Sequence, residues 1–396
     1  MSSSGSRDES TAAYAARLSR ARQAPVLLDA PNQPISAWQA GWLDDSGLAL
    51  FFVIQIFCYR LFPLLGGFLA DRYSKRSTLA FGSLLQALGL AALCQATSSQ
   101  ALFFAGGLVG IGGGLLNPVI YSMLSQVSGP AGSRAFSTHY LLINVGALAG
   151  PLVLWPAFGN ACLWLLLPAG VALVTVLASS AESRAIPAPH RSASWFAPLH
   201  DPIFLRVFIL FSAIWACYTM IFSSAPLIAA ELGLRTQGNV WLGVNSATVL
   251  LAYLWTLRRP ARTGISWPSV TAGLALTTVG VALVGAAPAG WMVGAGIVVL
   301  SIGELLSIPV LYHLVSEHAP AHARSRYFGF IWVAGAFGEA GAQALLWACP
   351  QPRAVCIVAA AMLAIATVTT TRKVKVRAAE INATESCELS TSQRAT

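Results

Sequence analysis

Eleven runs of predominantly apolar residues, most of them separated only by short polar joints, follow one another along this chain. An α-helix needs roughly 20 such residues to cross the hydrocarbon core of a bilayer. The runs are 47–70, 77–96, 100–125, 136–158, 161–180, 203–230, 239–257, 267–287, 290–316, 327–349 and 354–371. The sequence therefore predicts an all-α, polytopic membrane protein.

The low content of charged residues agrees with this fold class. Only 10% of the 396 residues are charged, whereas 56% are hydrophobic. Soluble domains contain about 25% charged residues. The chain therefore has too little polar surface to fold as a water-soluble globule.

The positions of lysine and arginine assign each joint to one side of the membrane. If the joint at 71–76 faces the cytoplasm, then so does every second joint, and the outward joints hold only Arg235 and Arg353. Up to position 377, the inward joints and the tail hold fifteen basic residues: Arg72, Lys75, Arg76, Arg134, Arg184, Arg191, Arg258, Arg259, Arg262, Arg324, Arg326, Arg372, Lys373, Lys375 and Arg377. Cytoplasmic loops carry such an excess. We therefore expect a bacterial inner-membrane protein with a cytoplasmic C-terminus, and the net charge of +9 does not indicate nucleic-acid binding.

The first span is ambiguous. Eleven spans with a cytoplasmic C-terminus would place the N-terminus outside, yet residues 1–22 carry Arg7, Arg17, Arg20 and Arg22. A twelfth span within 23–44 would restore the expected orientation, but the stretch contains three prolines and several polar residues. Two interpretations stay open: this segment inserts against neighbouring helices, or the first helix is altered in this chain.

The joint at 181–202 is the longest interior one and is rich in proline. It predicts an N-terminal helical bundle with a polar tail over 1–180 and a C-terminal bundle over 203–371. The joint itself is expected to be a central cytoplasmic loop, and residues 372–396 a cytoplasmic tail. Two six-helix bundles joined in this way are typical of transporters built from repeats.

A glycine, an aspartate and a group of basic residues close the first strong span, at Gly67, Asp71, Arg72, Lys75 and Arg76. The glycine permits close helix contact, and the aspartate can accept hydrogen bonds from backbone amides at a helix end. The pattern resembles the signature between the second and third helices of the major facilitator superfamily. This resemblance implies a secondary transporter, in which the motif serves gating and topology. Ser74 stands where that family usually has glycine.

Two further stretches resemble parts of the same superfamily. Gly146, Gly150 and Pro151 resemble part of the fifth-helix motif of its drug/proton antiporters, where these residues bend and pack the helix. Gly303-Glu304, with the prolines that follow, resembles the tenth-helix stretch of proton-coupled oligopeptide transporters and of some multidrug exporters. The first resemblance favours export, and the second keeps uptake open.

Three ionisable residues, Arg60, Glu304 and Glu339, fall near the centres of predicted spans. Charged groups at this depth are costly and mark transport sites or structural ion pairs between helices. One arginine can pair with only one of the two glutamates, and removal from water disfavours the charged form of the other. We expect Glu304 or Glu339 to bind the coupling proton. Arg60 would pair with a glutamate or contact a substrate anion, although a purely structural ion pair stays an alternative.

Three polar residues are further candidates for lining a substrate cavity: Asn117, Tyr140 and Asn144. Asn117 precedes Pro118, which is expected to break its helix and to leave carbonyl groups without partners. Such proline kinks also occur in purely structural settings.

No catalytic or metal-binding pattern and no phosphate-binding loop is present in the sequence. We therefore expect no enzymatic activity, no cofactor and no metal. The sequence predicts a monomeric, proton-coupled secondary transporter in the lipid bilayer that exports a toxic or drug-like small molecule by alternating access. Proton-driven uptake of peptides or similar nutrients is the first alternative, and a membrane sensor that does not transport is the second.

Overall fold

The structure is a computed structural model that describes residues 45–127, 129–153, 195–234, 239–257 and 267–369. These residues form helices and connecting turns, and none of them lies in a β-strand. The helices are α3 (Asp45–Arg72), α4 (Lys75–Gln95), α5 (Ser99–Leu124), α6 (Gly129–Val153), the 3-10 helix η2 (Ala197–His200), α8 (Pro202–Thr219), α9 (Ser224–Glu231), α10 (Asn239–Leu257), α11 (Trp267–Ala286), α12 (Gly290–His318), α13 (Arg324–Ala348) and a last helix, Pro352–Thr369. The predicted all-α class is confirmed.

Every predicted span except 161–180 coincides with helix. That span and the doubtful segment 23–44 lie outside the described residues, so the count of eleven stays a prediction. Seven of the described helical segments are long and apolar enough to cross a membrane: Leu50–Arg72, Lys75–Leu93, Ser99–Leu124, Pro202–Glu231, Pro268–Ala286, Gly290–His318 and Pro352–Thr369. Helices α6 and α13 are each 25 residues long and are not among these seven.

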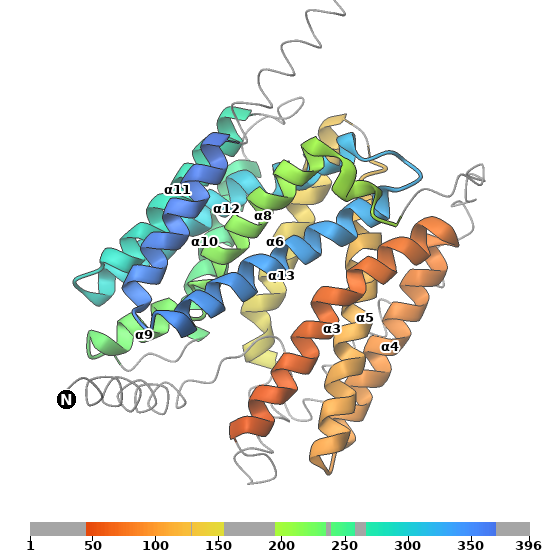
Figure 1. Cartoon of the computed structure of the whole chain (residues 1–396), viewed down its shortest axis with the longest axis horizontal. Helices are drawn as coiled ribbons and strands as arrows, with labels where there is room; N and C mark the ends of the chain where they lie inside the picture. The colour runs from red at the N-terminus through yellow and green to blue at the C-terminus, as the bar shows by residue number, and fades with distance from the viewer. Residues whose placement is uncertain (1–44, 128, 154–194, 235–238, 258–266, 370–396) are drawn as a thin grey trace, which may run out of the picture.

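The helices form two packed groups that meet along α13 and α6 (Figure 1). Helices α3 and α4 both pack on α5, and α11 packs on α12. Helix α13 contacts both α3 and α8, while α6 contacts α10 and α12. Side chains on these six helices can therefore meet residues far away in the sequence.

Polar side chains cap the helices where the joints begin. Ser74 precedes α4 and its hydroxyl accepts from the Ser77 amide at 3.4 Å. Asp201 precedes α8 and accepts from the amides of Ile203 and Phe204 at 3.0 and 3.1 Å. Such caps satisfy amides that have no partner within the helix. At Ser74, the departure from the family's usual glycine thus supplies a helix cap.

The predicted single span 203–230 is two helices, α8 and α9, joined by a turn. The Thr219 hydroxyl donates to the Trp215 carbonyl at 2.7 Å, and Ser223 donates to the Thr219 carbonyl at 2.9 Å. Hydroxyl bonds of this type compete with the backbone ladder and bend helices. Pro226 lies in the first turn of α9, where its missing amide has no helical partner to lose.

At Pro118, by contrast, the structure has a continuous helix where the sequence predicted a break. Helix α5 continues through Pro118, from Ser99 to Leu124. A proline removes one hydrogen bond from a helix, and packing against α3 and α4 on either side offsets that loss. The expected break after Asn117 is therefore wrong.

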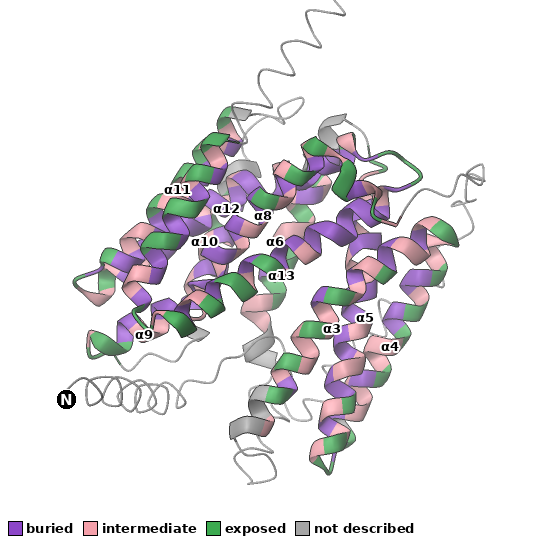
Figure 2. Ribbon diagram, viewed as in Figure 1, coloured by how far each residue is buried: buried purple, intermediate pink, exposed green. Residues whose placement is uncertain are grey.

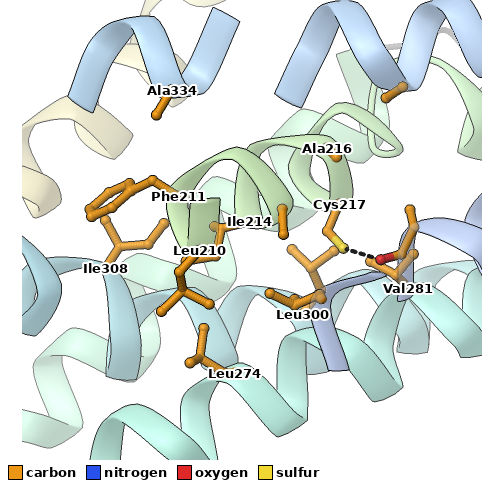
Figure 3. Close-up of a cluster of buried hydrophobic side chains, with 14 of the residues drawn as sticks. Leu210, Phe211, Ile214, Ala216, Cys217, Leu274, Val281, Leu300, Ile308 and Ala334 are labelled. Atoms are coloured by element: carbon orange, nitrogen blue, oxygen red, sulfur yellow. Dashed lines mark hydrogen bonds between the residues drawn. The ribbon is translucent and has the colours of Figure 1, made fainter. Parts of the chain in front are cut away.

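Both groups of helices contain buried residues along their facing sides (Figure 2). Small residues bring α3, α4 and α5 together: a Cβ at Gly112 would stand 2.5 Å from the backbone nitrogen of Gln86. The C-terminal helices also approach closely at glycines, and they contribute most of one large apolar core, which includes Phe211, Ile214 and Leu300 (Figure 3). In this core the Cys217 thiol donates to the Ala359 carbonyl at 3.4 Å. The buried polar groups that follow are thus held within closely packed helices.

Candidate functional site

Glu304 lies on α12 and is fully buried. Its Oε2 accepts hydrogen bonds from the Tyr140 hydroxyl of α6 at 3.2 Å and from Asn245 Nδ2 of α10 at 3.1 Å. Its Oε1 is buried without a partner. Among the described residues, none of the ion pairs involves Glu304. The carboxyl group is therefore held by neutral donors alone.

Asn245 is fully buried and is the residue at this site that the sequence analysis missed. Its Nδ2 also donates to Ser301 Oγ at 2.8 Å, and that hydroxyl donates to the Ile297 carbonyl at 2.7 Å. This chain of bonds fixes the amide toward Glu304. An asparagine followed by a serine inside an apolar run was the available signal, because buried polar side chains in membrane helices usually bond across helices.

Glu339 lies on α13 and pairs with Arg60 of α3. Two guanidinium nitrogens take part: Nε donates to Oε2 at 3.0 Å, and Nη2 donates to Oε1. The side chain of Arg60 is 10% exposed and that of Glu339 is 25% exposed. Arg60 thus pairs with Glu339, and none of the basic residues that the structure describes forms an ion pair with Glu304.

Aromatic rings surround the Arg60 guanidinium. Its central carbon lies 4.5 Å from the centre of the Trp215 ring, 5.3 Å from Trp332 and 5.8 Å from Tyr59. Arginine is attracted to such ring faces, more strongly when water is excluded. The rings and Glu339 together compensate a charge that would otherwise be costly at this depth.

The motif at the end of α3 joins the two groups of helices. Asp71 accepts from the amides of Ser325 and Arg326 at 3.1 and 2.9 Å, so it caps the N-terminal end of α13. The Arg326 guanidinium adds a bond to Asp71 at 3.4 Å. A Cβ at Gly67 would overlap the Ser325 carbonyl, so glycine permits this close approach.

The basic residues of the same motif have different surroundings. Lys75 Nζ donates to the Ser122 carbonyl at 3.4 Å, which fastens the start of α4 to α5. Arg72 is exposed and Arg76 is half-buried. The bundle end that carries these residues is called the basic end below. At this end, Trp195 also stacks on Phe68 with ring centres 4.2 Å apart.

The remaining candidates do not contact the Glu304 carboxyl group. Asn144 is buried, but its amide donates to the Tyr140 carbonyl of its own helix at 3.0 Å. Gly146 has nothing within 4 Å of the position a Cβ would take, so no described helix packs closely on it. Pro151 lies within α6, and the surroundings of Gly150 and Pro151 are outside the described residues. Asn117 Nδ2 is buried without a partner.

A bundle of membrane-length helices with ionisable groups buried between its two halves defines the class of polytopic membrane transport proteins. The model of the Major Facilitator Superfamily matches residues 28–342. The chain belongs to this superfamily and is therefore a multi-pass membrane transporter.

Individual relatives agree with this assignment. The chain is 28% identical over 307 residues to the multidrug resistance protein MdtH of Aeromonas hydrophila subsp. hydrophila, covering 74% of this chain and 75% of that protein. Two solved structures share the fold. The bacterial homologue of the iron transporter ferroportin in an outward-facing state has a TM-score of 0.66 at 18% identity, covering 86% and 93% of the two chains. The human organic anion transporter MFSD10 (TETRAN) has a TM-score of 0.66 at 15% identity, covering 84% and 87%.

Proposed function

We propose that this transporter exports a toxic or drug-like small molecule in exchange for protons. The observation that carries the proposal is Glu304, a fully buried carboxyl group with only neutral partners. Burial disfavours the charged form of such a group, so Glu304 can hold a proton in one conformation and release it in another. The multidrug resistance proteins that resemble the chain support export as the direction.

Alternating access would use the contacts between the two groups of helices. Tyr140 and Glu304 join α6 to α12, and Arg60 and Glu339 join α3 to α13. The contact between Tyr140 and Glu304 weakens when Glu304 becomes protonated, because a hydroxyl group donates a stronger hydrogen bond to a carboxylate than to a neutral acid. Protonation of Glu304 thereby becomes linked to the separation of these helices.

At the basic end, the Asp71 bonds to α13 hold the two groups together. With this end in the cytoplasm, these bonds would keep the transporter closed toward the cytoplasm. Opening to the cytoplasm then requires Asp71 to leave the end of α13. The predicted orientation, with a cytoplasmic C-terminus, belongs to this proposal.

The test is survival of an efflux-deficient bacterial host on a panel of antibiotics, toxins and toxic dipeptides, with and without the protein. We expect protection that disappears when a protonophore collapses the proton gradient. The variant Glu304→Gln, produced at the same level in the membrane, should give no protection. Sensitisation to toxic dipeptides would overturn export in favour of uptake. Ligand binding without flux in vesicles would favour the sensor.

A further inference from the structure

The arginine of the buried ion pair keeps one edge free. Glu339 engages Nε and Nη2 of Arg60, while Nη1 is buried and has no partner. A Cβ at Gly335 would stand 2.9 Å from Nη1 and 3.3 Å from the Trp215 ring. Glycine at this position therefore lets Nη1 and the Trp215 ring approach the backbone of α13 closely.

Two other buried donors without partners lie around the same rings. Trp332 Nε1 belongs to α13, next to Arg60, and Asn117 Nδ2 belongs to α5. Buried donors in folded proteins are nearly always paired with protein, water or ligand. Three donors from three helices thus lack partners, and none of their own side chains offers a buried unpaired acceptor. We infer that an oxygen atom from outside the chain accepts hydrogen bonds from these donors.

Ring contacts place Asn117 in the same cluster as Trp332. One helical turn before Asn117, a Cβ at Gly113 would touch the Tyr59 ring at 3.0 Å, and Tyr59 packs edge-on against Trp332 with centres 5.5 Å apart. One turn after Asn117, Tyr121 lies 6.3 Å from Trp332. Residues four apart share a helix face, so Asn117 faces the rings between these two contacts.

The charge of the cluster restricts what the donors bind. Arg60 and Glu339 together are neutral, so a carboxylate placed at Nη1 would bring an uncompensated negative charge into the membrane interior. Burying an unpaired charge is far more costly than burying a hydrogen-bonded carbonyl group. The surrounding rings, of which Tyr59 and Trp215 are half-buried, favour a flat aromatic partner that can stack.

We propose that Arg60, Trp332 and Asn117 form a substrate subsite for aromatic compounds that carry an uncharged acceptor oxygen, such as an aryl ketone or aryl amide. The inference rests on the proposed function in that the ligand is the transported molecule. Glu304 takes no part in this subsite, which separates recognition of the substrate from handling of the proton.

The test measures equilibrium binding of tritiated 2-acetylnaphthalene to the full-length protein in lipid nanodiscs, corrected with empty nanodiscs. The competitors are 2-isopropenylnaphthalene, in which a CH₂ group replaces the carbonyl oxygen, and 2-naphthoate. We expect the ketone to bind about tenfold more tightly than its isostere, which is the effect of one or two buried hydrogen bonds. The naphthoate should bind more weakly than the ketone.

Trp332→Phe keeps the ring and removes the N–H, and it should weaken ketone binding about tenfold while leaving the isostere unchanged. Trp241→Phe is the matched control, because Trp241 Nε1 is also buried without a partner but lies on α10. Asn117→Ala serves as a second variant if Trp332→Phe fails to fold. Gly335→Ala, which places a methyl group beside Nη1, should also weaken binding of the ketone.

Equal affinity for the ketone and its isostere, or an equal loss with Trp241→Phe, would overturn the subsite and leave water as the partner of these donors. A different outcome would refute the proposed function and not the subsite: the efflux-deficient host gains no protection, although the ketone still binds selectively. Protection without selective binding would refute the subsite alone.

Discussion

Two glutamates within the helical bundle have opposite surroundings. Glu339 on α13 pairs with an arginine that aromatic rings surround, and a quarter of its side chain is exposed. Glu304 on α12 is fully buried, and its hydrogen-bond partners among the described residues are a tyrosine and an asparagine. A paired carboxylate stays charged because its partner compensates it, whereas an unpaired one is more easily neutralised. Under the proposed function, the comparison predicts proton exchange at Glu304 and cohesion between helices at Glu339.

The largest expected difference between the two concerns proton coupling. Glu304→Gln keeps an acceptor oxygen for Tyr140 and Asn245 but removes the proton-binding group, so substrate-driven proton movement should fall to the background level. Glu339→Gln should keep measurable coupling, because Glu304 is intact. The measurement is the pH change inside proteoliposomes, followed with a trapped dye after substrate is added. Equal and near-native transport by both variants would remove the basis of the comparison.

Stability should respond in the reverse order. Glu339→Gln leaves Arg60 buried without its counter-charge, and the loss of one partner of such a pair costs about 3 kcal/mol. Glu304→Gln exchanges one neutral hydrogen-bonded group for another and should cost less than about 1 kcal/mol. Unfolding in mixed micelles at rising SDS fraction measures both values. Arg60→Met combined with Glu339→Gln should recover part of the loss, and a double variant as unstable as Glu339→Gln would contradict this account.

A smaller effect is expected when one donor to Glu304 is removed. Tyr140→Phe deletes the 3.2 Å bond between α6 and α12, and one such bond contributes about 1 kcal/mol. The transport rate should change about fivefold. Tyr253→Phe is the matched control, because the Tyr253 hydroxyl joins α10 to Thr138 of α6 at 3.0 Å without touching Glu304. A similar change in both variants would mean that the tyrosine acts only in helix packing.

The sequence predicted the helices well, because a bilayer requires long apolar segments and their periodic recurrence is visible without an alignment. It failed where local chemistry changed the helix, as in the turn at Met220–Ser223 and the uninterrupted helix at Pro118. At both places the outcome depends on hydrogen bonds and packing that hydropathy does not describe.

The candidate site was predictable in its residues but not in its partners. Arg60, Glu304 and Glu339 stand out because charges inside apolar runs are rare. Which glutamate meets the arginine depends on the contact between α3 and α13, whose paired residues are 279 positions apart. The donors Asn245 and Trp332 are polar groups in apolar runs. Their neighbours, Glu304 for Asn245 and Arg60 for Trp332, follow from the packing of α10 and α13 and not from the sequence.

A third acid, Asp201, lies outside the membrane-spanning segments and extends the comparison to an acid held by several hydrogen bonds. Its charge should have the smallest effect on stability of the three acids. Burial raises the pKa of Asp201, but hydrogen bonds from the Phe204 amide, His318 and Tyr327 outweigh it and hold this pKa below its usual value. A lowered pKa means that the charged form stabilises the fold above the unfolded value of about 3.9, and that this contribution is lost as the pH falls below it.

Asp201→Asn should therefore destabilise slightly at pH 7 and less at pH 3, since asparagine caps a helix as well as aspartate does. Asp201→Ala also removes the cap and should cost about 1 kcal/mol at both pH values. SDS unfolding at the two pH values separates the charge from the cap. If Asp201→Asn were equally destabilising at pH 3 and pH 7, the contribution of Asp201 would come from its shape and hydrogen bonds alone. The contrast with Glu304 would then rest on burial and not on the partners that each acid faces.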